Sequence, residues 1–190
     1  MMNTLIDKAK LLALKEIDEN GSPALEHFEI SNKKGQELAE KFDVDKDIVM
    51  LGTILMDLKL GECIKEGKVK EHVERSTEAA AIFLDKMNVD EELSKKIINC
   101  VEAHHGTKEY ICKEAEICAN ADCYRFIHPN GVFAYFVVLG KRFDNVTAAL
   151  EQIEAKMEEK WNVLSLDFCK KELKPYYDEF KALIETARTV

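Results

Sequence analysis

The chain has 190 residues, 46% of them hydrophobic and 33% charged, which suits one soluble domain with a single core. Its formal net charge of −9 argues against bulk nucleic acid as a partner, because phosphate backbones bind basic surfaces, but a small phosphorylated ligand responds only to the local field of its pocket. The sequence has no apolar run long enough to cross a bilayer and no signal-peptide pattern, so we expect a cytoplasmic protein without a membrane partner.

Helical periodicity runs through almost the whole sequence, and only three prolines and eight glycines interrupt it. Alternating apolar and polar residues are scarce, so the pattern predicts an all-α fold. In chain order, we expect helices over about residues 5–17, 24–42, 48–60, 69–87, 90–105, 113–126, 145–161 and 167–190. Residues 132–139 suit a helix or a strand, and their helical neighbours favour a helix. Pro175 is expected to kink or break the last helix.

Residues 48–60, with the sequence IVMLGTILMDLKL, form an apolar segment that carries one acid near its end. Thr53 is the only polar side chain between residues 48 and 56, and a helix that is apolar on every face is a buried helix. Asp57 follows directly, and a buried carboxylate is costly unless a cation or several donors meet it. An ion pair with Arg75 or Arg125 would satisfy it, and so would a metal ion.

Further polar side chains are predicted to face inward from neighbouring helices. The spacing of His27 and Leu38 puts both on one face, because eleven residues make almost whole helical turns. The inward polar set consists of His27, Asp57, His72, His104 or His105, and Asp122. A single inward histidine is more often a hydrogen-bonded core residue than a ligand, but imidazole and carboxylate together suit a first-row divalent metal. Such a metal can acidify a water and polarise a phosphoryl oxygen.

The sequence also contains six cysteines, at positions that form no C-x-x-C pair: Cys63, Cys100, Cys112, Cys118, Cys123 and Cys169. Their spacing fits no zinc template. We therefore expect reduced and mostly buried thiols, as is usual for a cytosolic protein.

In the order of these residues the sequence resembles the HD-domain superfamily of metal-dependent phosphohydrolases. That family has a lone His, a His-Asp doublet one buried helix later, further histidines and a final Asp. The matching segments here are EHFEISNKKGQELAEKF with His27, ILMDLKL with Asp57, HVERSTEAAAIFL with His72, IINCVEAHHG with His104 and His105, and EICANADCYRF with Asp122. The resemblance implies one HD-type domain over residues 1–190, with its core at about 24–126 and C-terminal helices at about 132–190.

Two departures from the family pattern fall at the doublet. Met56 replaces its histidine, and Leu58, Lys59 and Leu60 follow where members often have Ile-Gly-Lys. A thioether prefers soft metals, so Met56 does not replace a histidine as a ligand for a hard or borderline ion. Lys59 does not simply replace the displaced lysine either, because one residue along a helix rotates a side chain by about 100°.

The resemblance implies two metal-ligand sets that share Asp57. The first keeps His27, Asp57 and Asp122 and lacks one ligand, whereas the second is complete with Asp57, His72 and either His104 or His105. Our hypothesis is that the chain binds one divalent metal ion, which could be Mn, Fe, Ni, Co, Zn or Mg, and that Asp57 is the central catalytic residue. Phosphate would then contact local cations, with Lys59, Arg75 and Arg125 as candidates.

Two functions remain open at this point. The first is hydrolysis of a phosphomonoester or phosphodiester in a small phosphorylated molecule, with nucleotides as the expected example. The second is a non-catalytic HD domain that binds a metal, a nucleotide or a protein partner, and Met56 favours this alternative. In either case, residues 61–70 and 107–112 are expected to shape the pocket.

Overall fold

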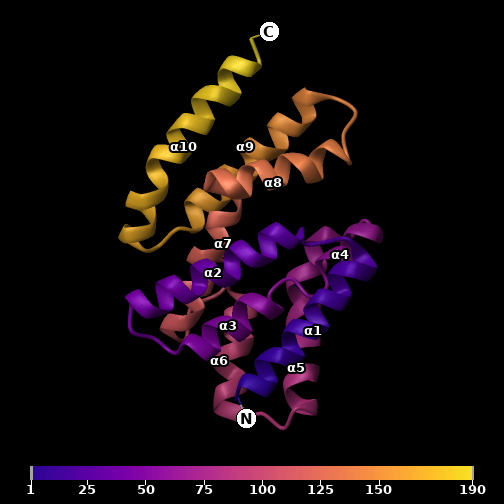
Figure 1. Cartoon of the computed structure of the whole chain (residues 1–190), viewed down its shortest axis with the longest axis vertical. Helices are drawn as coiled ribbons and strands as arrows, with labels where there is room; N and C mark the ends of the chain where they lie inside the picture. The colour runs from indigo at the N-terminus through magenta and orange to yellow at the C-terminus, as the bar shows by residue number, and fades with distance from the viewer. Residues whose placement is uncertain (1, 190) are drawn as a thin grey trace.

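The computed structural model describes residues 2–189 and is helical throughout, with no strand in that range (Figure 1). The predicted all-α fold is therefore confirmed. None of the helices in the described range combines the length and the apolar character that a membrane crossing requires. The helices are α1 Met2–Asn20, α2 Leu25–Lys41, α3 Lys46–Leu55, α4 Leu60–Lys65, the 3₁₀ turn η1 Val69–Glu71, α5 His72–Lys86, α6 Glu91–Glu102, α7 Lys113–Ile127, α8 Pro129–Gly140, α9 Val146–Val163 and α10 Asp167–Ala187.

The apolar segment predicted to be buried forms α3, and from Ile48 to its end only Met50 is partly exposed. The helix begins at Asp45, whose carboxylate accepts the backbone N–H groups of Asp47 at 2.9 Å and Ile48 at 3.2 Å. Gly52 lets it approach α6 and α7, because a Cβ added there would lie 2.8 Å from the sulfur of Cys118. The packing of α3 therefore depends on its glycine as well as on its apolar side chains.

Helix α7 is as central to the fold as α3. It packs against α2, α3, α6, α8, α9 and α10, and its residues from Ile117 to its end are all buried. In Figure 1 it lies between a group formed by α1–α6 and a second group formed by α8, α9 and α10. Since Asp122 and Arg125 are on α7, both are carried into the interior where these two groups meet.

The C-terminal helices share a second hydrophobic cluster, to which α8, α9 and α10 contribute. Helix α8 confirms the helical interpretation of residues 132–139, and it begins with Pro129, whose missing N–H has no intrahelical partner to lose at this position. Helix α10 continues through Pro175, so the predicted break does not occur.

Two predicted boundaries are wrong near the expected site. The buried helix ends at Leu55, so residues 56–59 form a turn, and residues 60–65 form α4 where a loop was expected. Helix α6 ends at Glu102, so His104 and His105 lie in the turn that follows it rather than on the helix. Gly106 in this turn has a φ of +66°, a conformation that glycine adopts without strain.

The cysteine prediction agrees with the structure. All six cysteines are free thiols, and Cys112 is the one that is partly exposed.

Candidate metal centre and cavity

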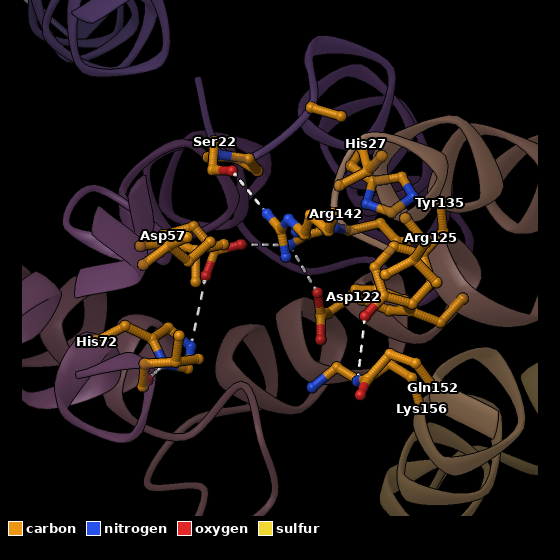
Figure 2. Close-up of a pocket in the computed structure, with 18 of the residues that line it drawn as sticks. Ser22, His27, Asp57, His72, Asp122, Arg125, Tyr135, Arg142, Gln152 and Lys156 are labelled. Atoms are coloured by element: carbon orange, nitrogen blue, oxygen red, sulfur yellow. Dashed lines mark hydrogen bonds and ion pairs between the residues drawn. The ribbon is translucent and has the colours of Figure 1, made fainter. Parts of the chain in front are cut away.

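Asp57 lies at the centre of the candidate site, in the turn between α3 and α4. The turn is fixed to α5 because the backbone N–H of Lys59 donates to the hydroxyl of Ser76 at 3.0 Å. The Asp57 side chain is buried, and its two oxygens face different groups. Figure 2 shows His72 on one side of the carboxylate and Arg125 with Asp122 on the other.

On the first side, two cations are paired with two carboxylates. Nη1 of Arg125 donates to Oδ2 of Asp57 at 2.6 Å and to Oδ1 of Asp122 at 2.8 Å. Nζ of Lys160 lies 2.6 Å from Oδ2 of Asp122, close enough for an ion pair although the angle does not make it a hydrogen bond. The ion pair between Asp57 and Arg125 is one that the sequence suggested as an alternative to a metal. We call these four residues the cation cluster.

The four groups of the cation cluster all keep their charges despite burial. Burial by itself raises the pKa of Asp57, but Arg125, His104 and His72 together outweigh it and hold that pKa well below its ordinary value. Lys160 and Arg125 do the same for Asp122. Conversely, burial lowers the pKa of each cation, and the neighbouring carboxylates raise it above its ordinary value. Two positive and two negative charges therefore leave the cation cluster neutral.

On the other side of Asp57, two histidines turn the same kind of nitrogen toward Oδ1. Nε2 of His72 and Nε2 of His104 each lie 3.7 Å from this oxygen. Nδ1 of His72 lies 2.6 Å from the carbonyl of Val69, and Nδ1 of His104 lies 2.6 Å from the carbonyl of Val101. A carbonyl only accepts, so both Nδ1 atoms carry a hydrogen, and in the neutral form of such a ring Nε2 presents a lone pair.

His104 is neutral in this environment. Burial, followed by the neighbouring His105, lowers the pKa of His104 to about 3. Within the described chain its buried Nε2 has no hydrogen-bond partner. His105 completes the group: the three histidines each offer a nitrogen within 4.8 Å of the others, while Nδ1 of His105 lies 3.0 Å from a carboxylate oxygen of Glu159. His104 and His105 therefore both belong to this group of three histidines, which is separate from the cation cluster.

The histidine side fits a metal ion on these observations. The two Nε2 lone pairs and Oδ1 of Asp57 are all acceptors, and a cation would satisfy them together. Their 3.7 Å separations are close to the roughly 3.3 Å that ligands at about 2.0–2.1 Å from a tetrahedral zinc require. The hydrogen bonds at Nδ1 are those that normally orient metal-binding histidines.

The first ligand set suggested by the resemblance does not fit a metal in this arrangement. Nε2 of His27 lies 2.9 Å from the carbonyl of Gly131, so this nitrogen donates and has no free lone pair. Burial and then the Arg125 cation lower the pKa of His27 to about 4. The carboxylates of Asp57 and Asp122 are already paired by cations. His27 is therefore a hydrogen-bonded interior residue here.

Two of the three cations proposed to contact phosphate lie elsewhere. Lys59 pairs with Glu16 at 3.0 Å and with Glu62 at 2.9 Å. Arg75 pairs with the glutamates of the surrounding surface, which are Glu62, Glu66 and Glu71. Neither Lys59 nor Arg75 lines the cavity beside Asp57, whereas Arg125 does.

A cavity of about 330 Å³ lies next to Asp57. Residues from both the histidine side and the cation cluster line it. Its polar wall includes His27, Asp57, His72, His105, Asp122 and Arg125, and its opposite wall comes from α8, α9 and the loop between them, with Tyr135, Arg142, Gln152 and Lys156 (Figure 2). Nη2 of Arg142 donates to the hydroxyl of Ser22 at 3.3 Å. Of the two segments expected to shape the pocket, residues 61–70 contribute Ile64 and Val69, and residues 107–112 contribute no lining residue.

Sequence reasoning missed Lys160, although a signal for it exists. Lys160 follows Ala149, Ile153 and Met157 at spacings of four, four and three residues, so it lies on the inward stripe of α9. A lysine on an apolar stripe needs a buried anion. Asp122 is that anion, but only the fold brings the two residues together.

The sequence and the structure of the chain were compared with those of known proteins. No protein-family model matches the chain. The chain is 34% identical over 110 residues to Ribonuclease Y from Finegoldia magna, and the match covers 57% of this chain but only 19% of that protein's length. Its structure is similar to that of Bacillus subtilis YpgQ, with a TM-score of 0.68 and 14% identity, over 99% of this chain and 96% of YpgQ.

A second solved structure is also similar to the chain. It belongs to an uncultured Thermotogales bacterium and is described as a predicted HD superfamily hydrolase. The TM-score is 0.59 at 17% identity, and the superposition covers 90% of this chain and 92% of the other. The chain therefore shares its all-helical fold with both structures, and one of them carries the HD superfamily description that the sequence resemblance also suggests.

Proposed function

We propose that the protein hydrolyses a phosphate ester in a small molecule with the help of one divalent metal ion. The ion would be held by Asp57, His72 and His104, with His105 as a further ligand. One observation carries the proposal: Nε2 of His72 and Nε2 of His104 each lie 3.7 Å from Oδ1 of Asp57, and the buried Nε2 of His104 has no hydrogen-bond partner among the described residues. A metal in this position supplies an acidified water and polarises a phosphoryl oxygen.

The donor set also indicates the kind of metal. Imidazole nitrogens suit zinc, cobalt, nickel and iron, whereas magnesium prefers oxygen ligands and keeps most of its waters. Two or three imidazoles with a single carboxylate therefore favour a borderline transition metal over magnesium. We expect zinc, cobalt or nickel to bind more tightly than magnesium.

The charge of the site supports an anionic substrate. The cation cluster is neutral without a metal, so a divalent ion bound beside it would leave an excess of positive charge. Arg125, Arg142 and Lys156 line the same cavity and would orient a phosphate group toward His72 and His104. The role predicted for Arg125 in phosphate binding is retained in this proposal, and Arg142 and Lys156 replace Lys59 and Arg75.

The remaining wall of the cavity suits the organic part of such a substrate. It contains the aromatic rings of Phe126, Tyr135 and Phe143 together with aliphatic side chains from α8. A volume of about 330 Å³ is within the range of small-molecule sites. Nucleotides combine a phosphate with a flat ring, so they are the first substrates to test. The similarity to Ribonuclease Y supports the same choice, since the substrate that its name gives is a polymer of phosphodiester-linked nucleotides.

The test is a hydrolysis screen of metal-loaded protein. Nucleoside mono-, di- and triphosphates and a chromogenic phosphodiester are incubated with zinc, cobalt, nickel, manganese or magnesium. We expect phosphate or nucleotide release that depends on a transition metal and disappears in His104→Ala and Asp57→Asn. Arg75→Ala is a matched control, because Arg75 lies outside the cavity and should leave the rate unchanged.

The structure also favours a second candidate, a metal-dependent binding module without turnover. The supporting observation is that Met56 and the cation cluster occupy the region where the resemblance would place another metal ion. Metal and nucleotide binding by folded protein, with no hydrolysis under any metal, would favour this second function and contradict the first.

A further inference from the structure

We infer that Arg125 and Lys160 together stand in for a metal ion: they bind Asp57 and Asp122 in place of a divalent cation and exclude one from that position. The inference does not depend on catalysis and goes beyond the proposed function. It concerns only the cation cluster and the neighbouring Met56.

The contacts of Arg125 are those of a bridging cation. A single nitrogen, Nη1, contacts one oxygen of each carboxylate, at 2.6 Å from Asp57 and 2.8 Å from Asp122. The second oxygen of Asp122 lies 2.6 Å from Nζ of Lys160. Oδ2 of Asp57 and both oxygens of Asp122 are therefore already paired with cations of the protein itself.

The charges balance as they would with a metal. Arginine and lysine supply two positive charges, which equals the charge of one divalent ion. Burial in this part of the molecule is nearly complete, with relative exposures of 3% for Arg125 and 0% for Lys160. Adding a divalent ion beside them would bring two more positive charges into a buried cluster that is already neutral, and such an excess is strongly unfavourable.

The residue at position 56 agrees with this arrangement. Met56 is buried and borders a void of about 10 Å³ that Asp57 and Arg125 also line. A thioether packs beside a guanidinium without competing for its charge, whereas a histidine at the same place would be a metal ligand next to a fixed cation. The loss of the doublet histidine and the presence of Arg125 are thus two parts of one replacement.

An aromatic ring helps to hold the two cations in place. The ring centre of Phe126 lies 5.2 Å from the guanidinium carbon of Arg125 and 5.9 Å from Nζ of Lys160. Cations at such distances are attracted to the ring face, and more strongly where water is excluded. Both cations are therefore fixed by more than their carboxylate partners.

The experiment isolates this position from the proposed metal site. His72→Ala/His104→Ala is used as the parent, because it removes the ligands on the histidine side. Two further proteins are made in that parent: one carries Met56→His alone, and the other carries Met56→His/Arg125→Ala/Lys160→Met. Zinc and manganese binding is measured by calorimetric titration and by elemental analysis after dialysis, and the melting temperature is recorded with and without each metal.

We expect neither the parent nor its Met56→His variant to retain metal, because Arg125 and Lys160 are still present. The variant that lacks both cations should take up about one equivalent, since a vacated set of carboxylate and histidine ligands suits such an ion. Its melting temperature should rise when metal is added, whereas that of the parent should stay the same. Failure of the proposed hydrolysis would not alter any of these results.

Three results would overturn the inference. The first is metal retained by the parent, and the second is metal gained on Met56→His alone. The third is a folded cation-free variant that binds no metal. If that variant folds poorly, it is expressed with and without manganese: recovery of soluble protein only with manganese supports the inference, and equal loss under both conditions contradicts it. Met56→His alone remains informative in that case, because the cation cluster is intact.

Discussion

The two carboxylate oxygens of Asp57 are both buried, but they face different kinds of partner. Toward α7 and α9, Oδ2 meets a guanidinium, and every charge of the cation cluster has a partner within 3 Å. Toward α5 and the turn after α6, Oδ1 faces Nε2 of two imidazoles at 3.7 Å and no permanent cation. One side is electrostatically complete, whereas on the other side the buried Nε2 of His104 has no hydrogen-bond partner within the described chain.

This difference separates structural from functional polar groups. Buried charges that pair with one another specify how α7 and α9 pack, because removing one partner leaves the other unpaired. Buried acceptors without a donor do not stabilise the fold, and they are expected where a ligand supplies what is missing. The same carboxylate therefore belongs to the core through one oxygen and to the candidate site through the other.

The largest loss of stability is expected when a cation of the cation cluster is removed. Arg125→Ala leaves Asp57 and Asp122 buried without their shared cation, which should lower the free energy of unfolding by about 3–5 kcal/mol. Urea unfolding followed by circular dichroism measures it. Arg75→Ala is the matched control, because its ion pairs lie at the surface, and its effect should be far smaller. Equal losses in the two variants would show that burial of the charges is not what matters.

The next effect concerns pH and His27, which is buried against Phe126 and Tyr135 and hydrogen-bonded to the carbonyl of Gly131. Because the pKa of His27 falls from 6.5 to about 4 on folding, the unfolded state binds a proton between these values that the folded state does not. Stability is then lost as pH falls from 6.5 toward 4, by up to about 3 kcal/mol for this group.

The measurement for His27 is the melting temperature between pH 7 and pH 4 in the wild type and in His27→Gln. Glutamine keeps a donor for the carbonyl of Gly131 but does not titrate, so the variant should lose less stability over this range. Identical pH profiles would contradict the neutral, buried state of His27.

A comparable effect is expected on the incomplete side when metal is added. Zinc at about one hundred times its dissociation constant should stabilise the wild type by about 2.7 kcal/mol, through binding to the folded state alone. The same addition should leave His104→Ala almost unchanged, because one ligand is missing. Thermal unfolding with a zinc series tests this, and an equal shift in both proteins would place the metal elsewhere.

The smallest effect is expected at the rim of the cavity. Arg142→Ala should weaken the binding of a small phosphorylated ligand by about tenfold, or about 1.4 kcal/mol, because one charged donor is lost. Its melting temperature and zinc affinity should stay at the wild-type values, since Arg142 is exposed and contacts neither side of Asp57. Calorimetric titration with a nucleotide measures the change, and unaltered affinity would remove Arg142 from the binding site.

Periodicity predicted the helices and the burial of α3 because a repeating apolar pattern is a local property of the sequence. It placed His27, His72 and Asp122 inside for the same reason, and the structure buries all three. Periodicity could not predict which buried polar side chains contact one another. The pairing of Lys160 with Asp122 joins α9 to α7, and that of Arg125 with Asp57 joins α7 to the turn after α3, so both depend on how these elements pack.

The turn at Met56 and the ring orientation of His27 were missed for a related reason. A helix end without glycine or proline gives little local signal, so the apolar pattern of residues 48–60 was read as one helix. The direction of a histidine nitrogen depends on a carbonyl, that of Gly131, which is far away in the sequence. Ligand sets carried over from a family pattern therefore need the fold before their geometry can be compared with what a metal ion requires.

The central claim, one metal position on the histidine side and none in the cation cluster, is tested most directly by the metal content of three proteins after equilibration with zinc. These are the wild type, His72→Ala/His104→Ala and Arg75→Ala. The account predicts about one equivalent per chain in the wild type and in Arg75→Ala, and none in the histidine variant. Two equivalents in the wild type, or metal retained without the two histidines, would contradict it.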